Sequence, residues 1–187
     1  MEINMSGKEY KAKIMDEAQF ARSLARIAHE IIEKNAGAGQ VCLLGIRRRG
    51  IPIAEMLAKN IERFEGTRVP VGSIDVTLYR DDLTEVKELP EASDSRIPCD
   101  VRQYHVILVD DVIYTGRTAR AAIEAVFRYG RPRSIQLAVL VDRGHRELPI
   151  RPDYVGKNIP TSQNEVVSVM VQEIDGQTGV CIYEKTP

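Results

Sequence analysis

The chain has 187 residues, of which 43% are hydrophobic and 28% are charged, and its formal net charge is −1. This length predicts a single domain spanning residues 1–187, with enough apolar side chains for a proper core. The near-neutral charge excludes a protein that binds nucleic acid through its overall charge. Any nucleic-acid surface must therefore be a local basic cluster.

Cysteine usage and hydropathy exclude further classes. Cys42, Cys99 and Cys181 form neither a CxxC pair nor a zinc-binding set, and their odd number argues against a disulfide framework. The N-terminus lacks the apolar core of a signal peptide, and no apolar run is long enough to cross a membrane. We therefore expect a cytoplasmic protein.

The first half of the chain alternates helical and strand patterns. Asp16, with Gln19 three residues later, predicts a capping box at the start of a helix that ends at Asn35-Ala36-Gly37. Val41–Ile46 is a short apolar run typical of a strand covered on both faces. A helix is expected next, over about residues 51–63.

The second half continues this alternation after a long polar interruption. Strands are expected at 69–78, 106–109 and 135–141, and a helix at 117–129. Residues 79–104 are largely polar and acidic, which predicts a long flexible loop of the kind that is usually functional or disordered. The pattern predicts an α/β fold with a mainly parallel central sheet flanked by helices. Residues 142–187 are expected to form a small strand-rich lobe, with strands at 166–174 and 180–184 around a turn.

The segment Val106–Thr118 carries the strongest functional signal. Its apolar strand delivers Asp110 and Asp111 to the carboxyl edge of a parallel sheet, where ligands collect. The turn Thr115–Thr118 then enters a helix N-terminus, whose N–H groups and dipole favour phosphate. Carboxylates beside a phosphate cradle suit the hydroxyls of a ribose 5-phosphate. The alternatives are a strand-end turn or magnesium site followed by an ordinary helix cap.

This segment resembles the binding signature for phosphoribosyl pyrophosphate (PRPP) in type I phosphoribosyltransferases, which have a Rossmann-like fold. Ser73–Leu83, Leu140–Arg151 and Asp153–Ser162 are similar to one subfamily, PyrR. Its members are bifunctional: they attenuate transcription of pyrimidine operons and act as uracil phosphoribosyltransferases. The resemblance extends from about Ala12 to near the C-terminus and is weakest over residues 84–98.

The resemblance implies a set of PRPP-binding residues. The carboxylates would bind the ribose hydroxyls, the turn after them the 5-phosphate, and the arginine-rich turn at 47–50 the pyrophosphate. By itself, that arginine run could equally be a solvated basic turn. Mg²⁺ is expected to bind mainly through PRPP oxygens, without a dedicated protein metal site. The implied PRPP ligands are Arg48, Arg49, Gly50, Asp110, Asp111, Tyr114, Thr115, Gly116, Arg117 and Thr118, and the implied catalytic residues are Asp110, Asp111 and Arg80.

The implied reaction joins N1 of uracil to C1 of ribose with release of pyrophosphate, giving UMP. Arg80 lies in the loop that would close over the substrate and exclude water. The uracil pocket is expected at Asp142, Arg143, Asn158 and Ile159. The PRPP signature does not select the base. A purine phosphoribosyltransferase for hypoxanthine or guanine, without an RNA role, is therefore the alternative.

The resemblance also implies an RNA partner, a hairpin in an mRNA leader, whose binding UMP or UTP would promote. Arg26 and His29 lie three residues apart and share a helix face. Each basic residue taken singly would be read as a solvated charge. The positions matching the family's RNA-binding residues are Arg26, His29, Arg146, Arg151 and Lys157. By analogy, we expect a homodimer or a higher homo-oligomer.

Overall fold

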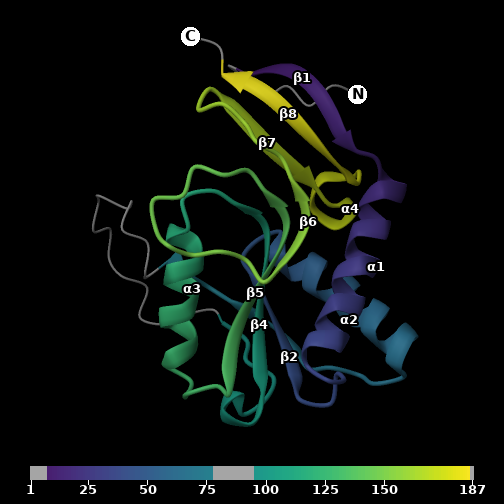
Figure 1. Ribbon diagram of the computed structural model, residues 1–187, viewed down its shortest axis with the longest axis vertical. Helices are drawn as coiled ribbons and strands as arrows, with labels where there is room; N and C mark the ends of the chain where they lie inside the picture. The colour runs from purple at the N-terminus through teal and green to yellow at the C-terminus, as the bar shows by residue number, and fades with distance from the viewer. Residues whose placement is uncertain (1–7, 78–94, 186–187) are drawn as a thin grey trace.

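The computed structural model describes residues 8–77 and 95–185, and it contains two sheets and three long helices in these ranges (Figure 1). The strands are β1 (Lys8–Met15), β2 (Val41–Ile46), β3 (Val71–Ile74), β4 (His105–Ile113), β5 (Ser134–Asp142), β6 (Tyr154–Asn158), β7 (Glu165–Met170) and β8 (Gly179–Lys185). The helices are α1 (Glu17–Lys34), α2 (Gly50–Glu65), α3 (Arg117–Phe127) and the short α4 (Gln172–Asp175), with a 3-10 turn at Val101–Gln103.

The main sheet is parallel, with strand order β3-β2-β4-β5-β6. Helices α1 and α2 cover one face and α3 covers the other (Figure 1). All six residues of β2 are buried, as expected for a strand with helices on both sides. The predicted α/β fold with a mainly parallel central sheet is confirmed.

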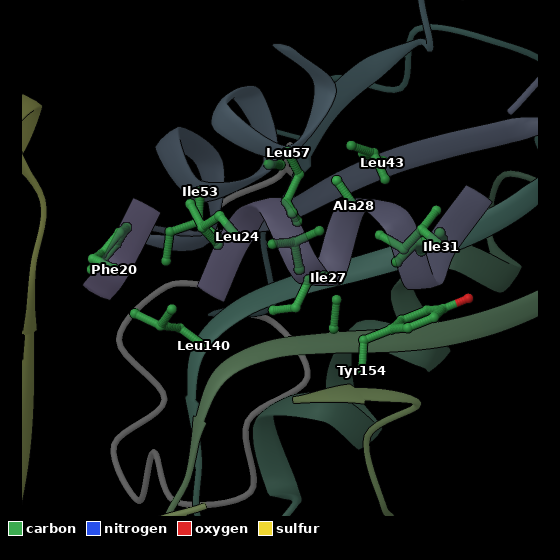
Figure 2. Close-up of a cluster of buried hydrophobic side chains, with 14 of the residues drawn as sticks. Phe20, Leu24, Ile27, Ala28, Ile31, Leu43, Ile53, Leu57, Leu140 and Tyr154 are labelled. Carbon is green, nitrogen blue, oxygen red and sulfur yellow. The ribbon is translucent and has the colours of Figure 1, made fainter. Parts of the chain in front are cut away.

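Helix α1 begins with the predicted capping box. Asp16 accepts a hydrogen bond from the N–H of Gln19 at 2.7 Å, and the Gln19 side chain accepts one from the N–H of Asp16 at 2.9 Å. The buried face of α1 packs mainly on α2 and β6, and Figure 2 shows its side chains Leu24 and Ile27 within the core cluster. Each such side chain contributes about 1.5–3 kcal/mol through burial. Truncation of Leu24 to Ala would cost about 2–5 kcal/mol.

The C-terminal region contains the expected strands, which are divided between the two sheets. β6 pairs in parallel with β5, with Asp142 opposite Asn158, so it extends the main sheet. β7 and β8 instead form an antiparallel sheet with β1, which the sequence analysis did not predict. β1 was missed although Tyr10, Ala12 and Ile14 alternate with Lys11 and Lys13, which is the pattern of a strand with one buried face. The small strand-rich part of the predicted fold is thus the antiparallel sheet of β7 and β8, to which β1 is added, while β6 belongs to the main sheet.

Two predicted strands are longer than the observed ones. The strand expected at 69–78 spans only Val71–Ile74. The strand expected at 166–174 ends at Met170, and α4 follows it. Asp175 accepts a hydrogen bond from the N–H of Val171 at 2.9 Å, which closes this helical turn. The N–H of Asp175 also donates to the carbonyl of Val171 at 2.8 Å, so this segment forms a helical turn in place of the predicted end of the strand.

The predicted loop at 79–104 is only partly within the described residues, since 78–94 lie outside them. Residues 95–104 are held against the sheet and are not a free loop. Arg96 and Ser73 exchange two backbone hydrogen bonds of 2.9 Å. Val101 is buried, and the Sγ atoms of Cys99 and Cys42 lie 3.3 Å apart. No helix in the described ranges is long and apolar enough to span a membrane.

Candidate active site

The carboxyl ends of the parallel strands bring most of the predicted site residues to one edge of the sheet. The arginine turn follows β2, and Asp110 and Asp111 lie near the end of β4. Asp142 ends β5 and Asn158 ends β6. In an open parallel sheet this edge is where ligands bind. Strand order thus gathers residues that lie up to about a hundred positions apart in the sequence.

A cavity of about 340 Å³ opens where β4 passes into α3. The connecting turn contains Gly116 at φ +94°, a left-handed conformation that favours glycine. The first N–H groups of α3 have no acceptor within the helix, so this end offers an anion site. The lining residues are Asp110, Val112, Ile113, Tyr114, Thr115, Gly116, Arg117, Thr118, Ala119, Leu137, Val139 and Glu147.

The segment after β5 folds back over this turn. The N–H groups of Glu147 and Leu148 both donate to the carbonyl of Thr115, at 2.9 and 3.1 Å. Arg117 donates through Nε to the Glu147 carboxylate at 2.7 Å. The predicted phosphate ligand Arg117 therefore already has an acidic partner in this structure. The neighbouring Thr115 and Thr118 line the cavity, and Thr115 Oγ1 accepts a hydrogen bond from the N–H of Arg117 at 3.3 Å.

Asp110 and Asp111 are adjacent near the end of β4, and Asp110 Oδ1 accepts a hydrogen bond from the N–H of Asp111 at 2.9 Å. Asp110 lines the cavity, and the positive charge of Arg49 acts on Asp111. Burial raises the pKa of Asp110, and the charge of Asp111 raises it further. Burial also raises the pKa of Asp111, against the lowering effect of Asp110 hydrogen bonding and of Arg49. Two close, partly desolvated carboxylates are poised to accept hydrogen bonds from hydroxyl groups or to face a cation.

The turn after β2 lies directly against β4. A Cβ added to Gly50 would sit 2.2 Å from the carbonyl oxygen of Val109, so only glycine permits this approach. The turn includes a cis peptide between Arg47 and Arg48. The Arg48 side chain is exposed, whereas Arg49 forms a two-point ion pair with Asp175. The predicted pyrophosphate residues Arg48, Arg49 and Gly50 thus adjoin the carboxylates of β4.

The predicted base-pocket residues differ from one another in exposure and in bonding. Arg143 is only 8% exposed, and its guanidinium lies 4.2 Å from the centre of the Tyr114 ring. Asp142 accepts a hydrogen bond from Arg146 Nη2 at 2.5 Å. Ile159 is buried in the core, so its side chain is not available to line an open pocket. Asn158 is exposed at the sheet edge.

The predicted RNA-binding residues fall into two groups. Three are engaged within the protein: Arg26 donates to the carbonyls of Val155 and Gly156, His29 stacks on Phe64, and Arg146 donates to the carbonyls of Tyr114 and Ile150. Arg151 and Lys157 have exposed side chains. The five residues therefore differ in how free their side chains are to contact a ligand.

One basic residue escaped the sequence analysis. Arg22 lines a shallow cavity of about 330 Å³ together with Arg26 and Lys157. Arg22 lies four positions before Arg26, on the same face of α1, so helical spacing could have identified it. Arg80 lies outside the described residues. Among the described residues, no group of three or more His, Cys, Asp or Glu side chains could hold a metal ion.

Comparison with known proteins agrees with this geometry. The sequence profile of the phosphoribosyl transferase domain matches residues 12–174. A hypoxanthine-guanine phosphoribosyltransferase from Bacillus anthracis str. 'Ames Ancestor' superposes with a TM-score of 0.70 at 18% identity, over 94% of this chain and 99% of that one. The hypoxanthine phosphoribosyltransferase of Trypanosoma cruzi gives 0.72 at 19% identity, over 95% and 98% of the two chains. The fold and the site edge define the class as phosphoribosyltransferases.

Closer relatives identify the family within this class. "Bifunctional protein PyrR" of Clostridium novyi (strain NT) is 62% identical over 177 residues, which cover 95% of this chain and 99% of the relative. The protein of the same name from Thermus aquaticus is 57% identical over 176 residues, covering 94% and 97%. The chain belongs to the PyrR family.

Proposed function

We propose that this protein attenuates transcription of pyrimidine biosynthesis genes by binding RNA in response to uridine nucleotides, and that it also converts uracil and PRPP to UMP and pyrophosphate. The observation that carries the proposal is the pair Asp110 and Asp111 beside the glycine turn into α3, in a chain 62% identical to a bifunctional PyrR protein. The hypoxanthine enzymes that share the fold are only 18–19% identical, so they support the fold and not a purine substrate.

In the proposed site, PRPP would contact three parts of the sheet edge: the turn after β4, the carboxylates of β4 and the turn after β2. Thr115, Gly116 and Thr118 would hold the 5-phosphate through hydroxyls, N–H groups and the α3 dipole. Asp110 and Asp111 would accept hydrogen bonds from the ribose hydroxyls. Mg²⁺ would arrive with PRPP, held mainly by substrate oxygens, and supplies positive charge to the departing pyrophosphate. The remaining proposed ligands are Arg48, Arg49, Gly50, Tyr114 and Arg117.

In the proposed reaction, N1 of uracil displaces pyrophosphate from C1 through a transition state with oxocarbenium character. The protein contributes position and charge rather than a covalent nucleophile. Arg80 is proposed to act from the loop that closes over the substrate. The base would bind near Asp142, Arg143 and Asn158, with Ile159 contributing through its backbone.

The proposed RNA surface combines Arg26, His29, Arg146, Arg151 and Lys157, to which Arg22 is added because it lines the same cavity as Arg26 and Lys157. Arg151 and Lys157 are the best candidates for direct phosphate contacts because their side chains are exposed. Arg146 would act mainly by holding the segment after β5. We propose that the protein works in the cytoplasm as a homodimer or higher homo-oligomer.

The enzymatic proposal is tested by measuring pyrophosphate release from PRPP and Mg²⁺ with uracil, hypoxanthine, guanine, adenine and orotate in parallel. Turnover with uracil alone supports the proposal. Turnover with hypoxanthine or guanine but not uracil would replace it with the purine alternative. Turnover with no base would leave nucleotide-responsive RNA binding as the function.

The RNA proposal is tested by titrating a pyrimidine-leader hairpin with and without UMP or UTP, at several salt concentrations. We expect tighter binding with the nucleotide and weaker binding at high salt. Arg151→Gln with Lys157→Gln should weaken binding, whereas Arg131→Gln, an exposed residue before the amino end of β5, serves as the matched control. Equal affinity in all three proteins would contradict the proposed surface.

A further inference from the structure

Arg49, in the turn after β2, has an acidic partner far away in the sequence. Asp175 of α4 accepts hydrogen bonds from Arg49 Nε at 3.1 Å and from Nη2 at 2.7 Å. The carboxylate side chain is 13% exposed and the guanidinium side chain 36%. This two-point pairing is the strong, direction-specific form of an arginine–carboxylate bond.

The pairing occupies only one edge of the guanidinium. Arginine has five N–H donors in a fixed planar fork, and Asp175 uses the Nε and Nη2 side. No hydrogen bond links Nη1 to an acceptor among the described residues. The edge formed by the two Nη atoms can therefore bind a second anion while Asp175 remains in place.

The guanidinium lies between two carboxylates. Asp175 contacts it directly, and Asp111 is near enough for each charge to act on the pKa of the other. Asp111 belongs to the pair proposed to contact the ribose of PRPP. The free edge of Arg49 is thus held near the point where the pyrophosphate joins that ribose.

Asp175 is itself well anchored. Its Oδ2 atom also accepts the N–H of Val171 at 2.9 Å, and Gly176 in the left-handed region ends the turn immediately after it. Burial by itself would raise the pKa of Asp175, but the hydrogen bonds from Arg49 and Val171 outweigh burial and lower it. The carboxylate is therefore a charged, fixed partner rather than a mobile surface group.

We propose that Asp175 is a positioning residue for pyrophosphate: it fixes the Arg49 guanidinium so that the unused edge faces the phosphates of PRPP. The inference rests on the proposed role of the turn after β2 in pyrophosphate binding. It assigns a function to α4, which lies at the end of the small sheet nearest to the parallel sheet (Figure 1). The small sheet thereby contributes to the chemistry of the main sheet.

The test is a double-mutant cycle of Asp175→Asn and Arg49→Ala in the full chain, measuring kcat, the KM values for PRPP and uracil, and inhibition by pyrophosphate. Asp175→Asn should raise the KM for PRPP and the inhibition constant for pyrophosphate about tenfold, because a misplaced guanidinium binds poorly. The KM for uracil should stay unchanged. In the Arg49→Ala background, Asp175→Asn should have no further effect. Glu173→Gln, an exposed carboxylate in the same short helix, is the matched control.

The outcomes distinguish a failure of the positioning role of Asp175 from a failure of the pyrophosphate role of the turn after β2. If Arg49→Ala weakens PRPP but Asp175→Asn does not, or if their effects simply add, the positioning role is wrong and the pyrophosphate turn stands. If Arg49→Ala has no effect, the assignment of that turn fails and the inference fails with it. Asp175→Ser keeps an acceptor for the Val171 N–H but cannot bind the guanidinium at two points. It should reproduce the tenfold change with an unchanged melting temperature, and normal PRPP binding in this variant would overturn the inference.

Discussion

The turns after β2 and β4 occupy equivalent places, at the carboxyl end of a parallel strand and before a helix, yet they offer anions different groups. The turn after β4 presents backbone N–H groups, hydroxyls and a helix N-terminus around Gly116. The turn after β2 presents arginine side chains, of which Arg49 is held by Asp175. In the proposed site, the turn after β4 would bind anions through its backbone geometry, whereas the turn after β2 would depend on side chains placed by distant partners.

Because of this difference, we expect different substitutions to weaken anion binding at the two turns. Backbone N–H groups need only the correct local conformation, which a short sequence can encode. A long arginine side chain has many rotamers, so it binds well only if another group restricts it. We therefore expect the β4 turn to be sensitive to local changes and the β2 turn to be sensitive to changes elsewhere in the fold.

The largest expected effect concerns the carboxylates before the β4 turn. The double variant Asp110→Asn, Asp111→Asn removes two charged acceptors for ribose hydroxyls, each worth about 1.5–3 kcal/mol. The kcat/KM for uracil and PRPP should therefore fall about 10²- to 10⁴-fold. Asp100→Asn, at an exposed carboxylate before the 3-10 turn, is the control. Full activity in the double variant would refute the site assignment.

Alanine substitutions of Gly50 and Gly116 should affect stability and PRPP affinity differently in the two turns. Gly50→Ala places a Cβ 2.2 Å from the Val109 carbonyl oxygen, so we expect it to lower the free energy of unfolding by about 3 kcal/mol. Gly116→Ala makes only ordinary van der Waals contacts, the nearest 3.4 Å away at Leu148 Cβ, but must adopt φ +94° at a cost of about 1–2 kcal/mol. Urea denaturation and PRPP titration should therefore show a larger stability loss for Gly50→Ala. For Gly116→Ala, PRPP affinity should fall more than stability. Equal stability loss would contradict this distinction.

A third prediction distinguishes an arginine that holds structure from a lysine that meets solvent. Arg146→Ala removes bonds to Asp142, Tyr114 and Ile150 and should cost about 1–3 kcal/mol of stability. Lys157→Ala should leave the melting temperature unchanged and reduce the salt dependence of RNA binding by about one ion. Thermal melts and salt-dependent RNA titrations measure both. A stable Arg146→Ala protein that lost only RNA affinity would show that Arg146 contacts RNA directly.

The smallest expected effect is the pH dependence of stability, for which the direction of the change is the prediction. Both β4 carboxylates have pKa values raised by burial in the folded protein, so the folded state holds their protons more tightly than the unfolded chain. The stability they contribute is fully present below the ordinary pKa near 4 and is lost as the pH rises through the raised values. Without ligand, the Asp110→Asn, Asp111→Asn protein should therefore gain stability relative to the wild type as the pH increases from 4 to 8. Denaturation curves that keep a constant difference over this range would contradict the pKa shifts.

The sequence by itself determined the elements whose signal is local. The apolar runs of β2 and β4, the capping box at Asp16 and the strand–turn–helix around Gly116 were all readable because each depends on neighbours within a few residues. The proposed phosphate-binding turn belongs to this group, since its N–H groups follow from backbone conformation alone. The family resemblance also depends on these contiguous segments.

The tertiary structure decided what depends on distant residues. It joined β6 to the main sheet and paired β1 with β8, because strand partners are chosen by packing and not by local propensity. It placed Ile159 in the core and directed Arg26 and Arg146 to backbone carbonyls, so their side chains are partly or wholly engaged within the protein. It also brought Asp175 to Arg49 across 126 positions of sequence. A charge read from sequence has no known partner, and only the folded chain shows which charges remain available for a ligand.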